Sequence, residues 1–445
     1  MSPLRSSLVF VALAAVLVLG MVTSSPAKEP PAVGNEPTAV LGVSTRMPAG
    51  TLAWFDPLTL QALRGRKVGL GYHTGSYAFS SNRATLALGE CLERAGQASI
   101  RFVDARAMRR LGDVLLSNSY NCVSSLAWLQ PHRLLAVLTR TDSSDAEIAV
   151  VDPATRHVLS HAPLPSAPVA QSATGQELAL LFSNFDSIAP ARVGVVDADG
   201  DLRTIVVDNI PIGTVVDQTG QDFRARTVSP GFAVDPEGRR AFLVPANGPV
   251  VQIDLGTLAL SYHPLAHPSL LQRFLEWLTP AAEAKAIEGP VRQARWLGDG
   301  VLAVSGFDYS IADEGGQTEH VLAKPAGVEL VDTASWRARM LSSDSSEVAV
   351  AAGLVIAEGG EWDEANQVTK SPGLLAFAPD GTKRWALHVG EERLLYDSVG
   401  SLGYVWLSQG KMEVVDLASG SLLQTIDRNE AANPWPWLLA AQRSG

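Results

Sequence analysis

One phrase recurs along this chain: an apolar run that ends in Asp, a tight polar turn, and a second apolar run. It reads IAVVDPATRHVL from Ile148, VVQIDLGTLAL from Val250 and MEVVDLASGSLL from Met412. The Asp of the phrase recurs at positions 56, 104, 152, 197, 254, 332 and 416, and an Ala at 378 keeps the register. A period of about 40–50 residues predicts radial β repetition rather than a helical solenoid.

The last repeat displays the strands of one unit. GYVWLSQ (403–409) is a short apolar run, Gly410 and Lys411 form a turn, and a second run ends at Asp416 before LASGS and LLQTI. Four short strands joined by hairpin turns make a propeller blade. We therefore expect an all-β chain that forms a single β-propeller of seven or eight four-stranded blades, with eight favoured. The tail PWLLAAQ (436–442) can supply the inner strand that the first unit lacks and so close the ring.

These repeats resemble those of the YVTN-type β-propellers, in which a strand and loop precede a V-x-V-I-D-x-x-T strand and turn. The Y-V-T-N tetrad itself is absent, since the corresponding runs read FLVP (242–245) and YVWL (404–407). The resemblance implies a fold of the quinoprotein dehydrogenase-like and WD40-like propeller superfamily. It implies little about function, because a propeller is a scaffold that hosts many chemistries.

The N-terminus predicts export. Arg5 precedes an apolar run from Leu8 to Val22, and Ser25 and Ala27 provide the small residues of a cleavage site. We expect a signal peptide over 1–27, a Pro-rich linker over 28–38 and the propeller over 39–445. The protein would then be secreted, periplasmic or associated with the cell envelope. The alternative is an uncleaved membrane anchor, although the apolar run is shorter than the ~20 residues that a span needs.

Between the repeat Asp residues at 254 and 332, the chain has room for an insertion. Leu270, Leu271, Phe274, Leu275 and Leu278 follow helical spacing. We expect a short helical insertion at about 268–288, which either packs its apolar stripe on its own blades or serves as a lid or docking helix.

Cys91 and Cys122 are the two cysteines of the chain and fall in consecutive repeats. An exported protein can pair them, so a disulfide is predicted, with two separate buried thiols as the alternative.

Charge and motifs exclude several classes of function. The formal net charge of −11 disfavours nucleic acid as a partner. His263 and His267 form H-x-x-x-H, but a Pro follows each, so no metal site is expected there. The chain lacks a G-x-S-x-G elbow and a P-loop, and we predict no cofactor.

The recurrent Asp itself is interpreted as structural. It ends a strand immediately before a turn, where its carboxylate can accept hydrogen bonds from the backbone of the turn. We therefore predict turn capping rather than catalysis or metal binding for this position.

A better candidate site lies in the loops between the second and third strands of the blades, the B–C loops when the strands are lettered A to D from the ring centre. There, aromatic residues adjoin Asp in three repeats. The candidate ligand-binding residues are Phe185, Asp186, Phe307, Asp308, Tyr309, Trp362 and Asp363. Aromatic faces with carboxylates suit a sugar, a cation or a basic peptide. The alternative is that Asp is merely common in loops and that the aromatics cover the blade rim.

The sequence thus favours an exported binding or scaffold propeller whose loop face recognises a protein, a glycan or a small ligand. The alternative is an enzyme, either a lactonase-like hydrolase or a quinoprotein-like oxidoreductase. No catalytic residue can be assigned. A passive structural module of the envelope is a third interpretation.

Overall fold

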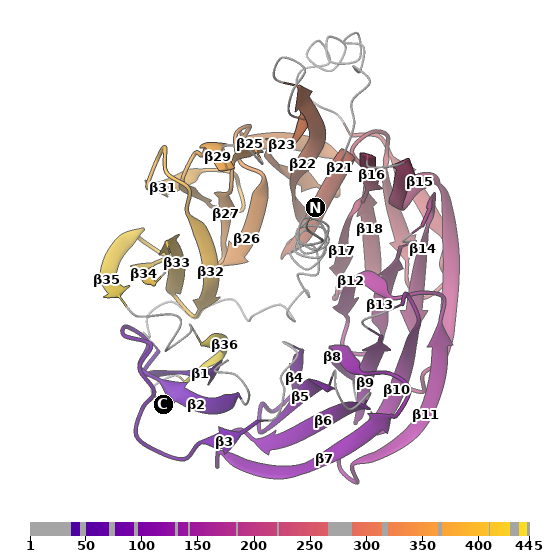
Figure 1. Cartoon of the computed structure of the whole chain (residues 1–445), viewed down its shortest axis with the longest axis vertical. Coiled ribbons are helices and arrows are strands. Elements are labelled where there is room, and N and C mark those ends of the chain that lie inside the picture. Colours follow the sequence, from indigo (N-terminus) through magenta and orange to yellow (C-terminus); the bar gives the residue numbers. More distant parts are fainter. Residues whose placement is uncertain are drawn as a thin grey trace, which may run out of the picture.

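The computed structural model describes residues 37–44, 50–70, 76–92, 97–129, 132–140, 143–183, 186–219, 222–265, 287–313, 319–363, 367–408, 410–427 and 436–442. These residues form antiparallel blades arranged as a ring around a central axis (Figure 1). Eight blades are present, which confirms the favoured number and rules out seven.

Blades 1 to 4 each run from an innermost strand near the ring axis to an outermost strand. Blade 1 holds β36 (Trp437–Gln442), β1 (Ala39–Ser44), β2 (Thr51–Phe55) and β3 (Val68–Gly69). Blade 2 holds β4 (Tyr77–Phe79), β5 (Thr85–Leu92), β6 (Gln97–Asp104) and β7 (Arg109–Ser117). Blade 3 holds β8 (Cys122–Leu129), β9 (Arg133–Thr139), β10 (Ala146–Asp152) and β11 (His157–Leu164). Blade 4 holds β12 (Pro168–Ala173), β13 (Leu178–Phe182), β14 (Ile188–Val196) and β15 (Leu202–Thr219).

Blades 5 to 8 follow the same order. Blade 5 holds β17 (Gly231–Asp235), β18 (Arg240–Val244), β19 (Val250–Asp254) and β20 (Leu260–His263). Blade 6 holds β21 (Ile287–Gly298), β22 (Val301–Asp313), β24 (Val328–Asp332) and β25 (Arg337–Ser342). Blade 7 holds β26 (Glu347–Ala351), β27 (Leu354–Glu358), β30 (Leu374–Phe377) and β31 (Lys383–Leu387). Blade 8 holds β32 (Leu394–Val399), β33 (Leu402–Ser408), β34 (Lys411–Asp416) and β35 (Ser421–Asp427).

The ring closes as the tail of the sequence predicts. The C-terminal strand β36 pairs antiparallel with β1, so the last strand of the chain becomes the innermost strand of the first blade. Closure of this kind leaves no blade with an unpaired inner position, which protects the sheet edges.

The predicted signal peptide and most of the predicted helical insertion lie outside the described residues. The last two positions of the predicted insertion, Ile287 and Glu288, belong to strand β21. Within the described ranges the chain contains no helix, and so none with the length and apolar character needed to cross a membrane.

The core consists of eight apolar clusters, one at each contact between neighbouring blades. Strand β9 illustrates how one strand contributes to two of these clusters. Leu134 and Ala136 pack toward blade 2, whereas Leu135 and Val137 pack toward blade 4. Because both faces of such a strand are buried, the sequence reads as a continuous apolar run without polar alternation.

The recurrent Asp caps the turn between the third and fourth strands, as predicted. Asp332 Oδ1 accepts hydrogen bonds from the backbone N–H groups of Ala334 and Ser335, and the same pattern recurs at Asp104 and Asp152. The hydrogen bonds from Ser335 are the largest cause that holds the pKa of Asp332 below its usual value. This recurrent residue therefore serves the fold rather than a ligand.

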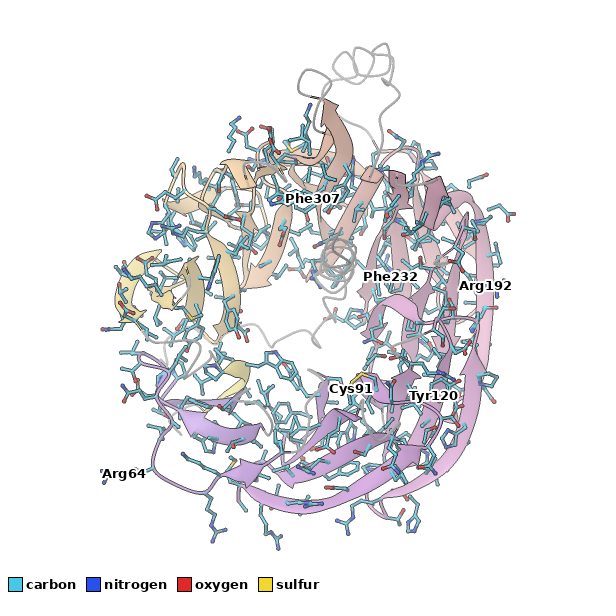
Figure 2. All side chains as sticks on the ribbon, viewed as in Figure 1. Arg64, Cys91, Tyr120, Arg192, Phe232 and Phe307 are labelled. Atoms are coloured by element: carbon cyan, nitrogen blue, oxygen red, sulfur yellow. A yellow bond between two sulfur atoms is a disulfide. The ribbon has the colours of Figure 1, made fainter. Side chains whose placement is uncertain are left out.

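A disulfide joins Cys91 of β5 to Cys122 of β8, with the two Cα atoms 4.0 Å apart. The bond links blade 2 to blade 3 and lies toward the inner side of the ring (Figure 2). It closes a chain segment with a sequence separation of 31 residues.

Replacing both cysteines with Ser is expected to lower the free energy of unfolding by about 3–4 kcal/mol, because the cross-link restricts the unfolded chain. Urea unfolding of the oxidised wild type and of the double variant measures the difference. Wild type reduced with dithiothreitol serves as the control and should unfold near the variant. Coincident curves for all three samples would contradict a stabilising bond.

Candidate functional site on the B–C and D–A face

Strands from blades 4, 6 and 7 extend beyond the propeller and pair with additional strands on the face that carries the B–C and D–A connections. The additional strands are β16 (Asp222–Val228), β23 (Glu319–Pro325), β28 (Glu361–Asp363) and β29 (Gln367–Lys370). Hydrogen bonding runs continuously from the end of β15 through β16, β21, β22, β23 and β28 to β29. We call this layer the platform sheet. It connects blade 4 to blades 6 and 7 across the ring face.

Gly306 allows β22 to serve both the blade and the platform sheet. Before Gly306 in the sequence, β22 pairs with β24 as far as Val304. After Gly306, β22 pairs with β23 from Phe307 onward. The backbone of Gly306 has a φ of 157°, and a Cβ there would lie 2.0 Å from the carbonyl oxygen of Val291. Only glycine fits this close approach, so it marks the point where the strand changes partners.

Three of the predicted aromatic residues share one side of the platform sheet. The rings of Phe307 and Tyr309 stack with centroids 5.8 Å apart. Tyr309 lies opposite Ala323, which lies opposite Trp362, and residues opposite one another in a sheet project to the same side. Phe307 and Tyr309 are half-buried, and Trp362 is 36% exposed. Figure 2 labels Phe307 on the strands of blade 6. We call these three residues the aromatic row.

The carboxylates predicted beside these aromatics project to the other side of the platform sheet, because side chains alternate along a strand. Asp308 is exposed, but its Oδ1 lies 2.8 Å from Nη1 of Arg292 in an ion pair. Asp363 is buried, with 7% of its surface exposed. Asp363 is therefore not exposed for ligand binding as its place among the candidate residues requires, and Asp308 already has a cationic partner.

The remaining predicted residues belong to blade 4. Asp186 is exposed and precedes β14, and β15, β16 and β21 separate β14 from the aromatic row in the order of hydrogen-bonded strands. Phe185 falls outside the described residues. The hydrogen-bonding order therefore groups Phe307, Tyr309 and Trp362 and leaves Asp186 at a distance from them.

A charged cluster that the sequence did not predict lies at the inner rim of the same face. Glu347 and Glu358 are directly paired across the β26–β27 hairpin of blade 7. Glu358 is buried and accepts a hydrogen bond from the backbone N–H of Leu395 in blade 8. Arg295 of blade 6 and Glu392 at the entry to blade 8 are close enough to Glu347 to affect its ionisation. We call Arg295, Glu347, Glu358 and Glu392 the rim cluster.

The pKa values of the carboxyl groups in the rim cluster are raised, which favours their uncharged forms. Burial, followed by the charge of Glu347, raises the pKa of Glu358 to about 8. Burial also raises the pKa of Glu347, and the neighbouring Glu392 adds to this effect while Arg295 opposes it. Tyr309, whose pKa is raised to about 12 by burial and then by Glu347, connects the rim cluster to the aromatic row. Perturbed pKa values that are gathered at one place in a protein mark a candidate functional site.

Part of this cluster was open to sequence reasoning. In SSEVAVAAGLVIAEGG, a tight turn at Ala352 and Gly353 pairs Val350 with Val355 and therefore pairs Glu347 with Glu358. The hairpin signal was thus present. The contributions of Arg295, Glu392 and Leu395 were not accessible, because they come from the two neighbouring blades.

The fold is similar to that of several solved propellers. Dihydro-heme d1 dehydrogenase NirN in complex with DHE has a TM-score of 0.54 and 11% identity over 95% of this chain and 78% of NirN. BamB from Moraxella catarrhalis has a TM-score of 0.46 and 12% identity, over 80% of this chain and 88% of BamB. Quinohemoprotein alcohol dehydrogenase from Comamonas testosteroni has a TM-score of 0.45 and 10% identity, over 80% of this chain and 67% of that enzyme.

No family model and no curated protein matches the chain. The resemblance to YVTN-type repeats therefore stays a resemblance of the repeats. At 11% identity the likeness to NirN concerns the fold alone. The chain is a β-propeller protein of eight blades.

Proposed function

We propose that this chain is an exported binding propeller whose B–C and D–A face recognises a protein, a glycan or a small ligand. The observation that supports this most is the platform sheet, which carries the aromatic row outside the packed ring. Exposed Trp and stacked aromatic rings on a rigid sheet are typical of recognition surfaces, because they supply contact area at a low entropic cost.

Loop faces of rigid scaffolds are where binding residues concentrate. Here the loops of blades 6 and 7 are themselves paired into strands, so Tyr309 and Trp362 are held in a defined register. A pre-organised surface binds more tightly, because less conformational freedom is lost on association. Export rests on the N-terminal sequence, and N-terminal sequencing of the native protein tests whether it begins near Lys28.

The binding function is tested by screening the purified protein against glycan and peptide arrays and a panel of small molecules. For a ligand found this way, Trp362→Ala is expected to weaken binding about 30-fold, since truncation of an aromatic anchor costs about 2 kcal/mol. Isothermal titration calorimetry measures the change. Because Trp362 is partly exposed, the variant should fold normally.

Tyr262→Ala is the matched control. Tyr262 is 44% exposed on β20, the outer strand of blade 5, and its loss should leave binding unchanged. Binding that survives Trp362→Ala and disappears in Tyr262→Ala would contradict the assignment of the face. Turnover of a lactone or alcohol in the same panel would favour the hydrolase or oxidoreductase alternative instead.

A further inference from the structure

We propose that the rim cluster binds an organic cation, either an ammonium or a guanidinium group, as part of the recognition face. This inference rests on the proposed binding function and specifies the chemical class of the ligand. It comes from the placement of Glu347 and Glu358 at the inner rim, beside Tyr309.

The charge balance of the rim cluster favours a cation. The rim cluster contains three carboxyl groups, those of Glu347, Glu358 and Glu392, and one guanidinium, that of Arg295, so the fully ionised cluster carries two excess negative charges. Arg393 also lowers the pKa of Glu392, but it forms an ion pair with Glu391, so including both of these residues leaves the excess at two negative charges. Burial raises the pKa of all three carboxyl groups, and an entering cation would stabilise their charged forms.

A buried hydroxyl next to the cluster points to a missing polar partner. Ser305 is 1% exposed, and its Oγ has no hydrogen-bond partner among the residues that the structure describes. It lies on β22 between Ala303, which packs against blade 7, and Phe307, so alternation directs it toward blade 7. Arg295 and Tyr309 face the same neighbour. A buried polar group normally has a partner, and a ligand donor would supply one.

The geometry suits an organic cation better than a metal ion. Within the described part of the chain, no group of three or more His, Cys, Asp or Glu is close enough to hold a metal. An ammonium or guanidinium group is larger and can contact separated carboxylates through several N–H donors. The aromatic row adds a second source of attraction, because cations favour the faces of Tyr and Trp rings.

Binding of a cation should be accompanied by loss of a proton from Glu358. The groups near this carboxyl group determine whether the affinity rises or falls with pH. The backbone N–H of Leu395 and the charge of Glu347 act on Glu358 directly, and Glu392 and Arg295 act on Glu347 in turn. Since burial raises the pKa of Glu358 to about 8, the carboxyl group is mostly protonated at pH 7 and must lose its proton to pair with a cation. Affinity is therefore expected to rise with pH between about 6 and 8 and to level off above the pKa.

The experiment is calorimetric titration of the whole protein in phosphate buffer with two probes. Agmatine represents a free organic cation, and the capped peptide Ac-Ala-Arg-Ala-NH2 represents a basic side chain. We expect binding of the peptide, of agmatine or of both. Glu347→Gln and Glu358→Gln should each weaken it about tenfold or more, because a hydrogen bond to a charged group contributes more than a neutral one. In Glu358→Gln the rise of affinity with pH should also disappear.

Glu237→Gln is the matched control, since it removes the same charge from the β17–β18 turn on the opposite face of the ring, where Glu237 is exposed. It should leave the affinity unchanged. Equal losses in all three Gln variants would overturn the proposal, because they would reflect the net charge of the protein. So would failure of both probes, or binding of Ca²⁺ or Mg²⁺ alone. A ligand that depends on Trp362 but not on Glu347 or Glu358 would overturn the cation inference and leave the binding function standing.

Discussion

Changing both Leu438 and Leu439 to Ala is expected to lower the free energy of unfolding by about 4–10 kcal/mol, since each buried Leu→Ala change costs about 2–5 kcal/mol. Leu438 is 1% exposed and packs between blades 8 and 1, while Leu439 is 2% exposed and packs between blades 1 and 2. The C-terminal strand β36 thus contributes to the apolar packing on both sides of blade 1. Because a domain is typically stable by only about 5–15 kcal/mol, most of the protein should unfold or aggregate.

Guanidinium or heat unfolding followed by circular dichroism measures this effect. Leu422→Ala on β35 is the matched control, since Leu422 is 52% exposed and should change stability little. A third variant, Tyr404→Phe, tests a contact between blades 8 and 1 that does not involve β36. Tyr404 is fully buried and donates a hydrogen bond of 3.0 Å to the carbonyl oxygen of Pro57, which links blade 8 to blade 1. A Leu438/Leu439 variant as stable as the control would show that the ring does not depend on β36.

The second large effect concerns Glu358. Its pKa rises from 4.5 to about 8 on folding, so the folded state prefers the protonated carboxyl group. The contribution to stability is complete below pH 4.5 and is lost as the pH rises through about 8. The Glu358→Gln variant cannot ionise. We therefore compare the free energy of unfolding of the variant with that of wild type at each pH. Between pH 4 and pH values above 8, this difference is expected to shift in favour of the variant by up to about 5 kcal/mol.

Urea unfolding of both proteins from pH 4 to pH 9 provides the measurement, and buffers without amines avoid occupation of the rim cluster. Gln can still accept the hydrogen bond from the backbone of Leu395, so the packing should be preserved. Two stability curves that run parallel over the whole range would mean that Glu358 ionises normally in the folded protein. The difference between the curves isolates this group from the capping Asp residues, whose lowered pKa values act only at acidic pH.

The repeated phrase determined the fold of this chain from sequence alone. Each phrase needs only local pairing, because Asp332 caps the turn that follows its own strand and the third and fourth strands are joined by a few residues. Local interactions of this kind are written directly into the order of residues. Counting the phrases favoured eight blades, and the inner strand missing from the first unit indicated that residues 436–442 close the ring.

Cys91 and Cys122 were also accessible from the sequence, because consecutive repeats place them in neighbouring blades. The aromatic residues were found, but their relation to the carboxylates was not. The sequence suggests loops at Phe307 to Tyr309 and at Trp362, whereas the structure pairs these segments into strands. Strand alternation then separates Asp308 and Asp363 from the aromatic row.

Only the tertiary structure decided the platform sheet and the rim cluster. The parallel pairing of β16 with β21 joins segments about 60 residues apart, and the rim cluster combines Arg295, Glu358 and Glu392 from three blades. No local pattern encodes such contacts, because they depend on how the blades are placed around the ring. Residue order determined the scaffold of this protein through short-range pairing, and the arrangement of the blades in space decided which charges meet at its rim.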